Sequence, residues 1–190
     1  MHNTTLILID MQNGMQTWRP GHRNNPGAEG QMAALLHAWR HNGMPVVHVR
    51  HISRSPDSVF APGQPGAAFQ PQFMPLPGEH IVEKNVPDAF VASGLERWLH
   101  VRGIRDLVIV GVSTNHSVES TARSAGNLGF AATVVADATY AYAQPDYAGV
   151  ERSAEEVHMM SLANLDGEYA AIRTTAEVLS GWPLRPAISG

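Results

Sequence analysis

The sequence contains no cysteine among its 190 residues. This absence excludes disulfide bonds, thiolate metal sites and a native thiol nucleophile. Positive charge is also scarce, since 13 Lys and Arg against 17 Asp and Glu give a formal net charge of −4. Because the chain has no excess of positive charge, we do not expect it to bind a nucleic-acid backbone or an anionic membrane. We expect a small-molecule substrate instead.

Long hydrophobic runs are missing as well. No stretch of the sequence approaches the roughly 20 consecutive apolar residues that span a bilayer. The N-terminal segment has no basic region before the four apolar residues from Leu6 to Ile9, as a secretory signal would have. We therefore expect a cytoplasmic protein with one domain over residues 1–182 and an extended tail over residues 183–190.

Short runs of leucine and β-branched residues recur along the chain and predict strands that are buried on both faces of a parallel sheet. Segments with helical spacing separate the runs, and Gly43, Gly103 and Gly129 each end such a segment before the next run. This alternation predicts a doubly wound, Rossmann-like α/β fold with helices on both faces of the sheet. The four strand runs are residues 6–9, 46–49, 107–110 and 131–135.

The remaining segments are less regular. Apolar spacing predicts a helix over residues 152–165, a short strand over 169–172 and a last helix over 175–179. Residues 53–78 are rich in Pro and Gly and have no sustained period, which predicts a long surface loop after the second strand. A loop in that position is expected to cover part of a site.

Three polar residues stand after strand-like runs: Asp10 follows the run 6–9, Lys84 follows residues 81–83, and Ser117 lies in the turn after the run 107–110. Ligands of open α/β sheets bind beyond the carboxyl ends of the strands, so these positions are candidates for chemistry. Taken singly, they are typical of a turn-capping carboxylate, a solvated lysine and a first-turn serine. Taken together, they supply a base, a charge stabiliser and a nucleophile beside a helix N-terminus, whose N–H groups can hold an oxyanion.

Three blocks of sequence carry a family resemblance: LILIDMQN at 6–13, PGEHIVEK at 77–84 with Ala89–Phe90, and GVSTNH at 111–116 with VESTAR at 118–123. Their order and spacing resemble the isochorismatase-like cysteine hydrolases from residue 5 to about residue 172. The resemblance implies a parallel sheet and an Asp-Lys-Cys triad that acts on amides or related small molecules. Asp10 matches the aspartate and Lys84 the lysine, but Ser117 stands where the family has its cysteine.

The resemblance also implies a cis peptide between Val112 and Ser113, with the backbone N–H groups of Ser113 and Ser117 as the oxyanion hole. It further implies a homo-oligomer, a dimer or tetramer, because relatives often complete the pocket from a neighbouring subunit. The expected substrate contacts, some of which would serve equally well as core, are Met15, Trp18, Phe90, Asn115, His116 and Tyr140.

Histidines raise two further questions. His48 and His51 lie near the position where a few relatives bind a metal through an Asp-x-His arrangement, but two histidines three residues apart on a strand point to opposite faces. We predict no metal and no cofactor. His116 precedes the nucleophile position, yet consecutive side chains at a helix start point apart, so a structural role is favoured over a general base for Ser117.

The serine decides which chemistry is expected. A free thiol has a pKa of about 8.5, which a nearby cation lowers, whereas a hydroxyl is much harder to ionise and a carboxylate is a poor base for it. We predict a hydrolase that cleaves the C–N bond of a small amide, carbamoyl or ureido compound in its cysteine form. The serine form is expected to show little or no turnover.

Two explanations of Ser117 remain open. The unchanged neighbours of the residue favour a cysteine-to-serine substitution that inactivates the enzyme. The alternative is a natural member without the cysteine. Such a member would be a vinyl-ether hydrolase of the isochorismate type, with Asp10 as the acid, or a non-catalytic binding protein.

Overall fold

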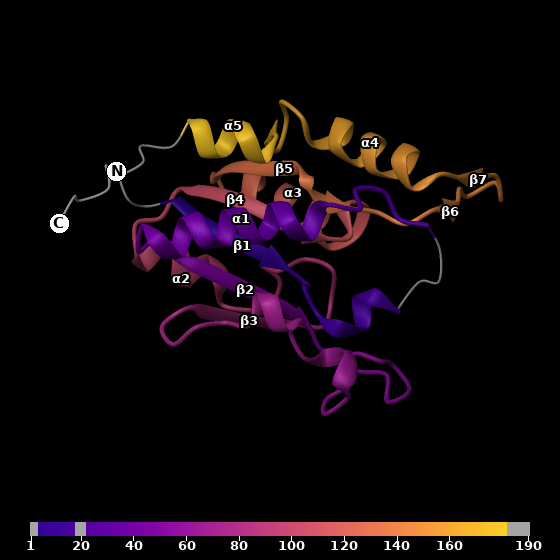
Figure 1. The fold of residues 1–190 in the computed structure, drawn as a ribbon, viewed down its shortest axis with the longest axis horizontal. Coiled ribbons are helices and arrows are strands. Elements are labelled where there is room, and N and C mark those ends of the chain that lie inside the picture. Colours follow the sequence, from indigo (N-terminus) through magenta and orange to yellow (C-terminus); the bar gives the residue numbers. More distant parts are fainter. Residues whose placement is uncertain (1–3, 18–21, 182–190) are drawn as a thin grey trace.

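A six-stranded parallel sheet lies at the centre of the computed structural model, which describes residues 4–17 and 22–181 (Figure 1). The strand order is β3-β2-β1-β4-β5-β8, so the chain runs outward from β1 in one direction and returns to β4 to run outward in the other. This doubly wound order confirms the predicted fold class and places a topological switch point between β1 and β4. The strands are β1 (Thr4–Ile9), β2 (Val46–His51), β3 (His80–Lys84), β4 (Asp106–Val112), β5 (Ala131–Tyr140) and β8 (Ala171–Arg173).

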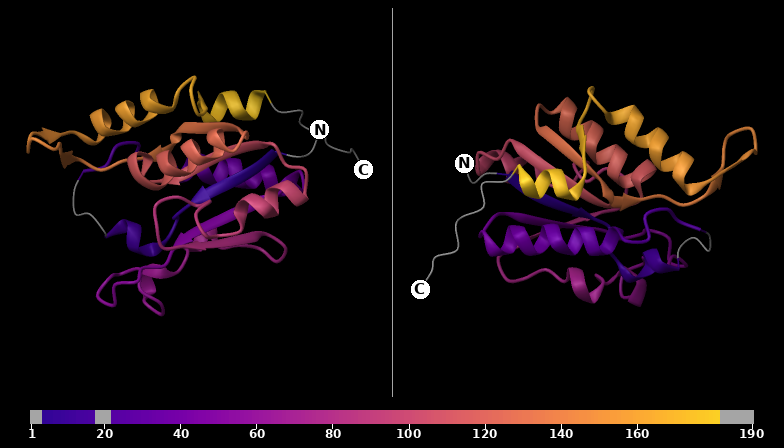
Figure 2. Two further views of the ribbon diagram at one scale, coloured as in Figure 1. Left: turned by 180° about the vertical axis from the view of Figure 1, so that it is seen from behind. Right: turned by 45° about the horizontal axis from the view of Figure 1, so that its top comes forward.

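Helices cover both faces of the sheet. Helices α1 (Ala28–His41) and α5 (Thr175–Ser180) pack on one face, while α2 (Leu95–Val101), α3 (Glu119–Asn127) and α4 (Ala154–Leu165) pack on the other. Figure 1 looks onto the face with α1, and the left view of Figure 2 shows α2 and α3 from behind. Successive residues of β1 enter the two cores alternately, which explains why the whole run is apolar.

The predicted elements differ from the observed ones at the sheet edges. The four predicted strands lie within β1, β2, β4 and β5, and the predicted C-terminal helices correspond to α4 and α5. Strand β3 lies outside these four because it is an edge strand that alternates exposed Ile81 and Glu83 with buried Val82 and Lys84. Strand β8 begins two residues later than expected. The short hairpin of β6 (Gln144–Pro145) and β7 (Glu151–Arg152) has too few residues to show a period.

The long loop predicted between β2 and β3 is present and is fastened to the end of β1. It contains two 3-10 turns, η2 (Pro65–Ala67) and η3 (Pro71–Phe73), and faces a third, η1 (Asn13–Gln16). The N–H of Asn13 donates to the carbonyl of Ala68 at 2.9 Å, and the N–H of Gln70 donates to the carbonyl of Met11 at 3.0 Å. The loop therefore has a fixed place beside the carboxyl end of the sheet. The predicted tail over residues 183–190 lies outside the described residues.

Gly111 allows β4 to approach β1 closely just before Asp10. Its φ is 122°, in a region that L side chains rarely adopt, and it pairs with Ile9 across the sheet. A Cβ atom at this position would lie 2.2 Å from the carbonyl oxygen of Ile9. A glycine is therefore required where the two strands meet at the switch point.

At the opposite end of the sheet, Glu79 joins α1, β2 and the start of β3. Its carboxylate accepts from Arg40 Nε at 2.7 Å, from Arg40 Nη2 at 2.8 Å, from the Leu76 N–H at 2.7 Å and from His48 Nε2 at 2.8 Å. Burial acts to raise the pKa of Glu79, but the bonds from Arg40, Leu76 and His48 outweigh it and lower the pKa to about 2. Burial also lowers the pKa of His48 and keeps the imidazole neutral.

We expect Glu79→Gln to lower the free energy of unfolding at pH 7 by about 2 kcal/mol, because hydrogen bonds to a charged group contribute about 1.5–3 kcal/mol each. A carboxyl with a lowered pKa stabilises the fold above its unfolded pKa, and this contribution is lost as the pH falls toward about 2. Urea denaturation from pH 7 to pH 3 should therefore show a flatter pH dependence for the variant. Glu83→Gln is the matched control, since Glu83 pairs with Arg50 and its side chain is 54% exposed. Equal losses in both variants would contradict this account.

Candidate active site

The carboxyl edge of the sheet brings together the three polar residues that follow strand runs. Asp10 follows β1, Lys84 ends β3, and Ser117 lies in η4 (Thr114–Val118), a π-helical turn between β4 and α3. Because β3, β2, β1 and β4 are consecutive neighbours in a parallel sheet, their carboxyl ends meet at one edge.

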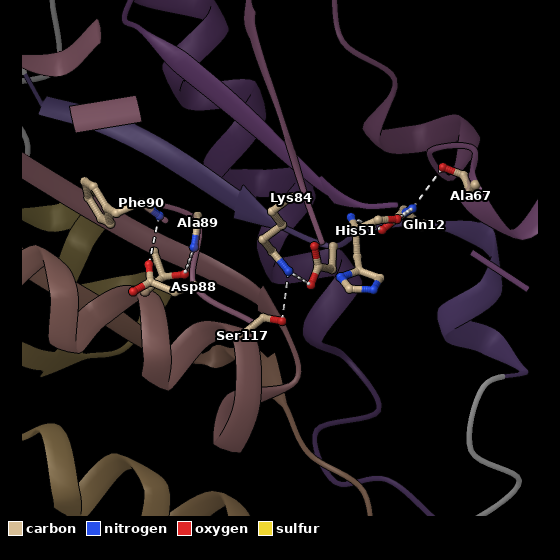
Figure 3. A network of polar contacts seen from close by, with 10 residues as sticks. Gln12, His51, Ala67, Lys84, Asp88, Ala89, Phe90 and Ser117 are labelled. Carbon is tan, nitrogen blue, oxygen red and sulfur yellow. Dashed lines mark hydrogen bonds and ion pairs between the residues drawn. The ribbon is translucent and has the colours of Figure 1, made fainter. Parts of the chain in front are cut away.

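Lys84 bridges the other two side chains (Figure 3). Its Nζ atom donates to Asp10 Oδ2 at 2.7 Å and to Ser117 Oγ at 3.1 Å. Asp10 and Lys84 are 1% and 3% exposed, and Ser117 is 9% exposed. Among the described residues, the second carboxylate oxygen, Asp10 Oδ1, is buried without a hydrogen-bond partner. A buried, unpaired carboxylate oxygen is costly unless a ligand or a transferred proton meets it.

The backbone at Asp10 turns its carboxylate toward Lys84. Asp10 has a φ of 53°, a left-handed conformation that aspartate adopts more readily than most residues. Its N–H still donates to the carbonyl of Val49 at 2.9 Å, while its own carbonyl accepts from the N–H of Gln12 at 2.7 Å. Such strained positions persist where surrounding contacts hold them, and they cluster at functional sites.

The turn that carries Ser117 is held from two sides. The peptide between Val112 and Ser113 is cis, as the resemblance implied, and the Ser113 carbonyl accepts from the N–H of Val118 at 3.2 Å. From α4, His158 Nδ1 lies 2.8 Å from Thr114 Oγ1, and Ser161 Oγ donates to the Thr114 carbonyl at 3.0 Å. Burial lowers the pKa of His158, so this contact is made by a neutral ring. The oxyanion hole of Ser113 and Ser117 N–H groups stays a prediction.

A cavity of about 360 Å³ opens onto Asp10 and Ser117. The long loop supplies three of the residues that line the cavity, namely Ser53, Ser58 and Phe60. The loop therefore covers part of the cavity, as expected. The other lining residues are Met15, His51, Pro87 and His116. This volume suits a small substrate that reaches the buried edge of the sheet.

The expected substrate contacts divide between the cavity and other places. Met15 and His116 line the cavity, and Asn115 lies beside it in a larger surface groove. Phe90 lies outside the lining because its ring packs on Phe130, with a centroid distance of 5.7 Å. Figure 3 shows this ring turned away from Lys84 and Ser117.

Tyr140 also lies outside the lining of the cavity. It is 1% exposed, its ring lies edge-on against Tyr142, and Arg23 sits 4.1 Å above the ring centroid. Its position at the end of β5 directs the ring into the core on the side of α1. Trp18 lies outside the described residues.

Sequence reasoning missed several cavity residues. His51, Ser53, Ser58, Phe60 and Pro87 were not expected as substrate contacts, and most of them belong to an irregular loop that carries no periodic signal. His51 had a usable signal, since it closes the β2 strand next to Lys84 in the β3 register. Side chains that pair in register on neighbouring strands point to the same face.

His48 and His51 do not share a site. His48 contacts Glu79 at the opposite end of the sheet, while His51 lines the cavity. Across residues 4–17 and 22–181, no group of three or more His, Cys, Asp or Glu side chains is arranged to hold a metal ion. Over the same ranges, no helix is long and apolar enough to cross a membrane.

The fold and this site define a doubly wound α/β protein with a buried acid–lysine pair and a hydroxyl at the carboxyl edge of its sheet. The Isochorismatase domain model matches residues 4–177, so the chain belongs to the isochorismatase family of hydrolases. It is 35% identical over 175 residues to the uncharacterized isochorismatase family protein YrdC of Bacillus subtilis, covering 92% of this chain and 94% of that one.

Two further comparisons bear on structure and activity. A crystal structure of an isochorismatase-family protein from Chromobacterium violaceum superposes with a TM-score of 0.91 at 47% identity, covering 95% of this chain and 93% of that one. The ureidoacrylate amidohydrolase RutB of Stutzerimonas stutzeri is 29% identical over an aligned length of 181 residues, and the match covers 76% of this chain and 72% of RutB. The relatives of this chain thus include an amidohydrolase.

Proposed function

We propose that the chain is built to hydrolyse the C–N bond of a small amide, carbamoyl or ureido compound when residue 117 is cysteine. In its serine form it binds the same substrate with little or no turnover. The observation that carries the proposal is the Lys84 bridge between Asp10 and Ser117 at the floor of a small cavity. The similarity to an amidohydrolase supports the choice of bond.

The proposed chemistry assigns one role to each group. The unpaired Asp10 Oδ1 takes the proton of the nucleophile at residue 117, and the Lys84 ammonium stabilises the anion that forms. The nucleophile attacks the carbonyl carbon, and backbone N–H groups of the turn hold the oxyanion. Asp10 then gives its proton to the leaving amine, and water releases the acyl group. No metal or cofactor has a part in this sequence.

The acyl intermediate provides the test. Ser117→Cys is mixed with a panel of carboxamide, carbamoyl and ureido compounds, quenched in acid and digested with trypsin. We expect at least one compound to add its acyl mass to the peptide of residues 106–123, which lies between Arg105 and the cleavage after Arg123. Ser117→Ala is the control without a nucleophile. If the folded cysteine form carries no adduct with any compound, the proposal is wrong.

Ser117 itself favours a second candidate. Protonation of a vinyl ether needs an acid but no nucleophile, and Asp10 is available for it beside a hydroxyl that leaves the site polar. A binding protein that catalyses no reaction would also be compatible with a serine at residue 117. Release of pyruvate from isochorismate by the serine form would favour the vinyl-ether hydrolase.

The homo-oligomer and the cytoplasmic location remain predictions.

A further inference from the structure

His51 occupies a position that the proposed mechanism does not use. It ends β2 and pairs in register with Lys84 of β3, so both side chains project from the same face of the sheet. It lines the cavity with Asp10 and Ser117. Figure 3 shows His51 close to the group formed around Lys84 and Ser117.

The backbone of His51 is clamped while its imidazole is left available. Gln12 accepts from the His51 N–H at 2.8 Å and donates to the His51 carbonyl at 2.9 Å. The ring lies edge-on against Phe60, with centroids 6.0 Å apart. Within the part of the chain that the structure describes, no hydrogen bond holds either ring nitrogen. A fixed backbone and an unengaged imidazole are what a proton acceptor in a cavity requires.

The charges around the ring favour its neutral form. Burial lowers the pKa of His51 most, Lys84 lowers it further, and Asp10 partly opposes them. The other titratable group in the lining is His116 of η4, and the loop wall contributes only Ser53, Ser58 and Phe60. A neutral imidazole near pH 7 can accept a proton from a water molecule in the cavity.

We propose that His51 is a catalytic residue that deprotonates the water which releases the acyl group from residue 117. The water oxygen forms a bond to the acyl carbon as its proton passes to the His51 ring. The bond between the acyl carbon and the residue 117 side chain then breaks, its electron pair stays on that side chain, and the proton returns there from His51. The inference rests on the proposed function, because it needs an acyl group at residue 117.

The test separates formation of the acyl group from its release. Ser117→Cys is mixed with p-nitrophenyl acetate, so that a burst of p-nitrophenolate reports acylation and the following steady rate reports release. Adding His51→Gln should leave the burst rate within about 3-fold and reduce the steady rate about 10²-fold, the lower end of general-base effects. His37→Gln, on the exposed side of α1, is the control and should change neither phase.

The pH profile supplies the second readout. A base must be unprotonated, so the steady rate of Ser117→Cys should fall as the pH drops through a midpoint below about 6.5, the ordinary histidine value. This limb should be absent in His51→Gln and in a second variant, His51→Asn, with melting followed by circular dichroism to verify folding. An unchanged steady rate overturns the inference, as does an equal loss of burst and steady rate. If Ser117→Cys releases no p-nitrophenolate above Ser117→Ala in either phase and carries no acyl adduct, the proposed function fails and the inference with it.

Discussion

Ser117→Cys is expected to raise kcat/KM for hydrolysis of the best small amide about 10³-fold or more over the serine form, since an unactivated hydroxyl is a poor nucleophile. The reason lies in the neighbours of the side chain. Lys84 Nζ is 3.1 Å from Ser117 Oγ and is itself paired with Asp10 at 2.7 Å. A cation at that distance stabilises a thiolate, whose thiol ionises near pH 8.5 when free, but it cannot make a hydroxyl ionise near neutral pH.

Ammonia release measures this gain, with each form assayed at several substrate concentrations below saturation. Ser113→Cys is the matched control, because Ser113 belongs to the same chain segment and is 3% exposed but has no hydrogen bond to Lys84. It should show no gain. A serine form that turns over amides as fast as Ser117→Cys would show that amide hydrolysis does not depend on a thiol at residue 117. If neither form releases ammonia, the vinyl-ether hydrolase becomes the leading candidate.

The sequence places Asp10, Lys84 and Ser117 after strand-like runs, and the family resemblance implies that the three side chains meet. Each residue follows a strand run, and parallel strands in a doubly wound sheet end at a common edge. The apolar runs of β1, β2 and β4 give the order of these strands along the chain, whereas their order in the sheet is seen in the structure. Even β3, with its weaker alternation, could be placed through the residues around Lys84.

The rest of the cavity depends on features that no period encodes. Phe60 and Ser58 reach it because Gln12 and Gln70 fasten the long loop to the end of β1, a set of side-chain bonds that has no sequence signature. Tyr140 follows the apolar run of β5, just as Asp10 follows the apolar run of β1, and it is one of the expected substrate contacts. Its strand, however, changes register with β4 between Ile109 and Gly111, and its ring points into the core. Side-chain direction at such an irregularity cannot be read from spacing alone.

Asp10→Asn in the Ser117→Cys background is expected to reduce kcat/KM for amide hydrolysis about 10³-fold, within the range of general acid–base contributions. The amide cannot take the thiol proton, nor can it return a proton to the leaving amine. The same change leaves the Lys84 ammonium buried without its counter-charge, because the ion pair of 2.7 Å is lost. Removing one partner of a buried pair costs about 3–5 kcal/mol, so the variant should also be less stable.

Activity and stability can be separated with the double replacement Asp10→Asn with Lys84→Met in the same background. Removing both charges eliminates the unpaired ammonium, and methionine fills much of the lysine volume, so the free energy of unfolding should recover to within about 2 kcal/mol of the parent. Hydrolysis should stay at the level of the single variant or below it, because the proton acceptor and the anion stabiliser are both gone. Urea denaturation and ammonia release on the same preparations measure the two quantities. Activity that recovers together with stability would show that Asp10 supports the fold around residue 117 and takes no part in the proton transfers.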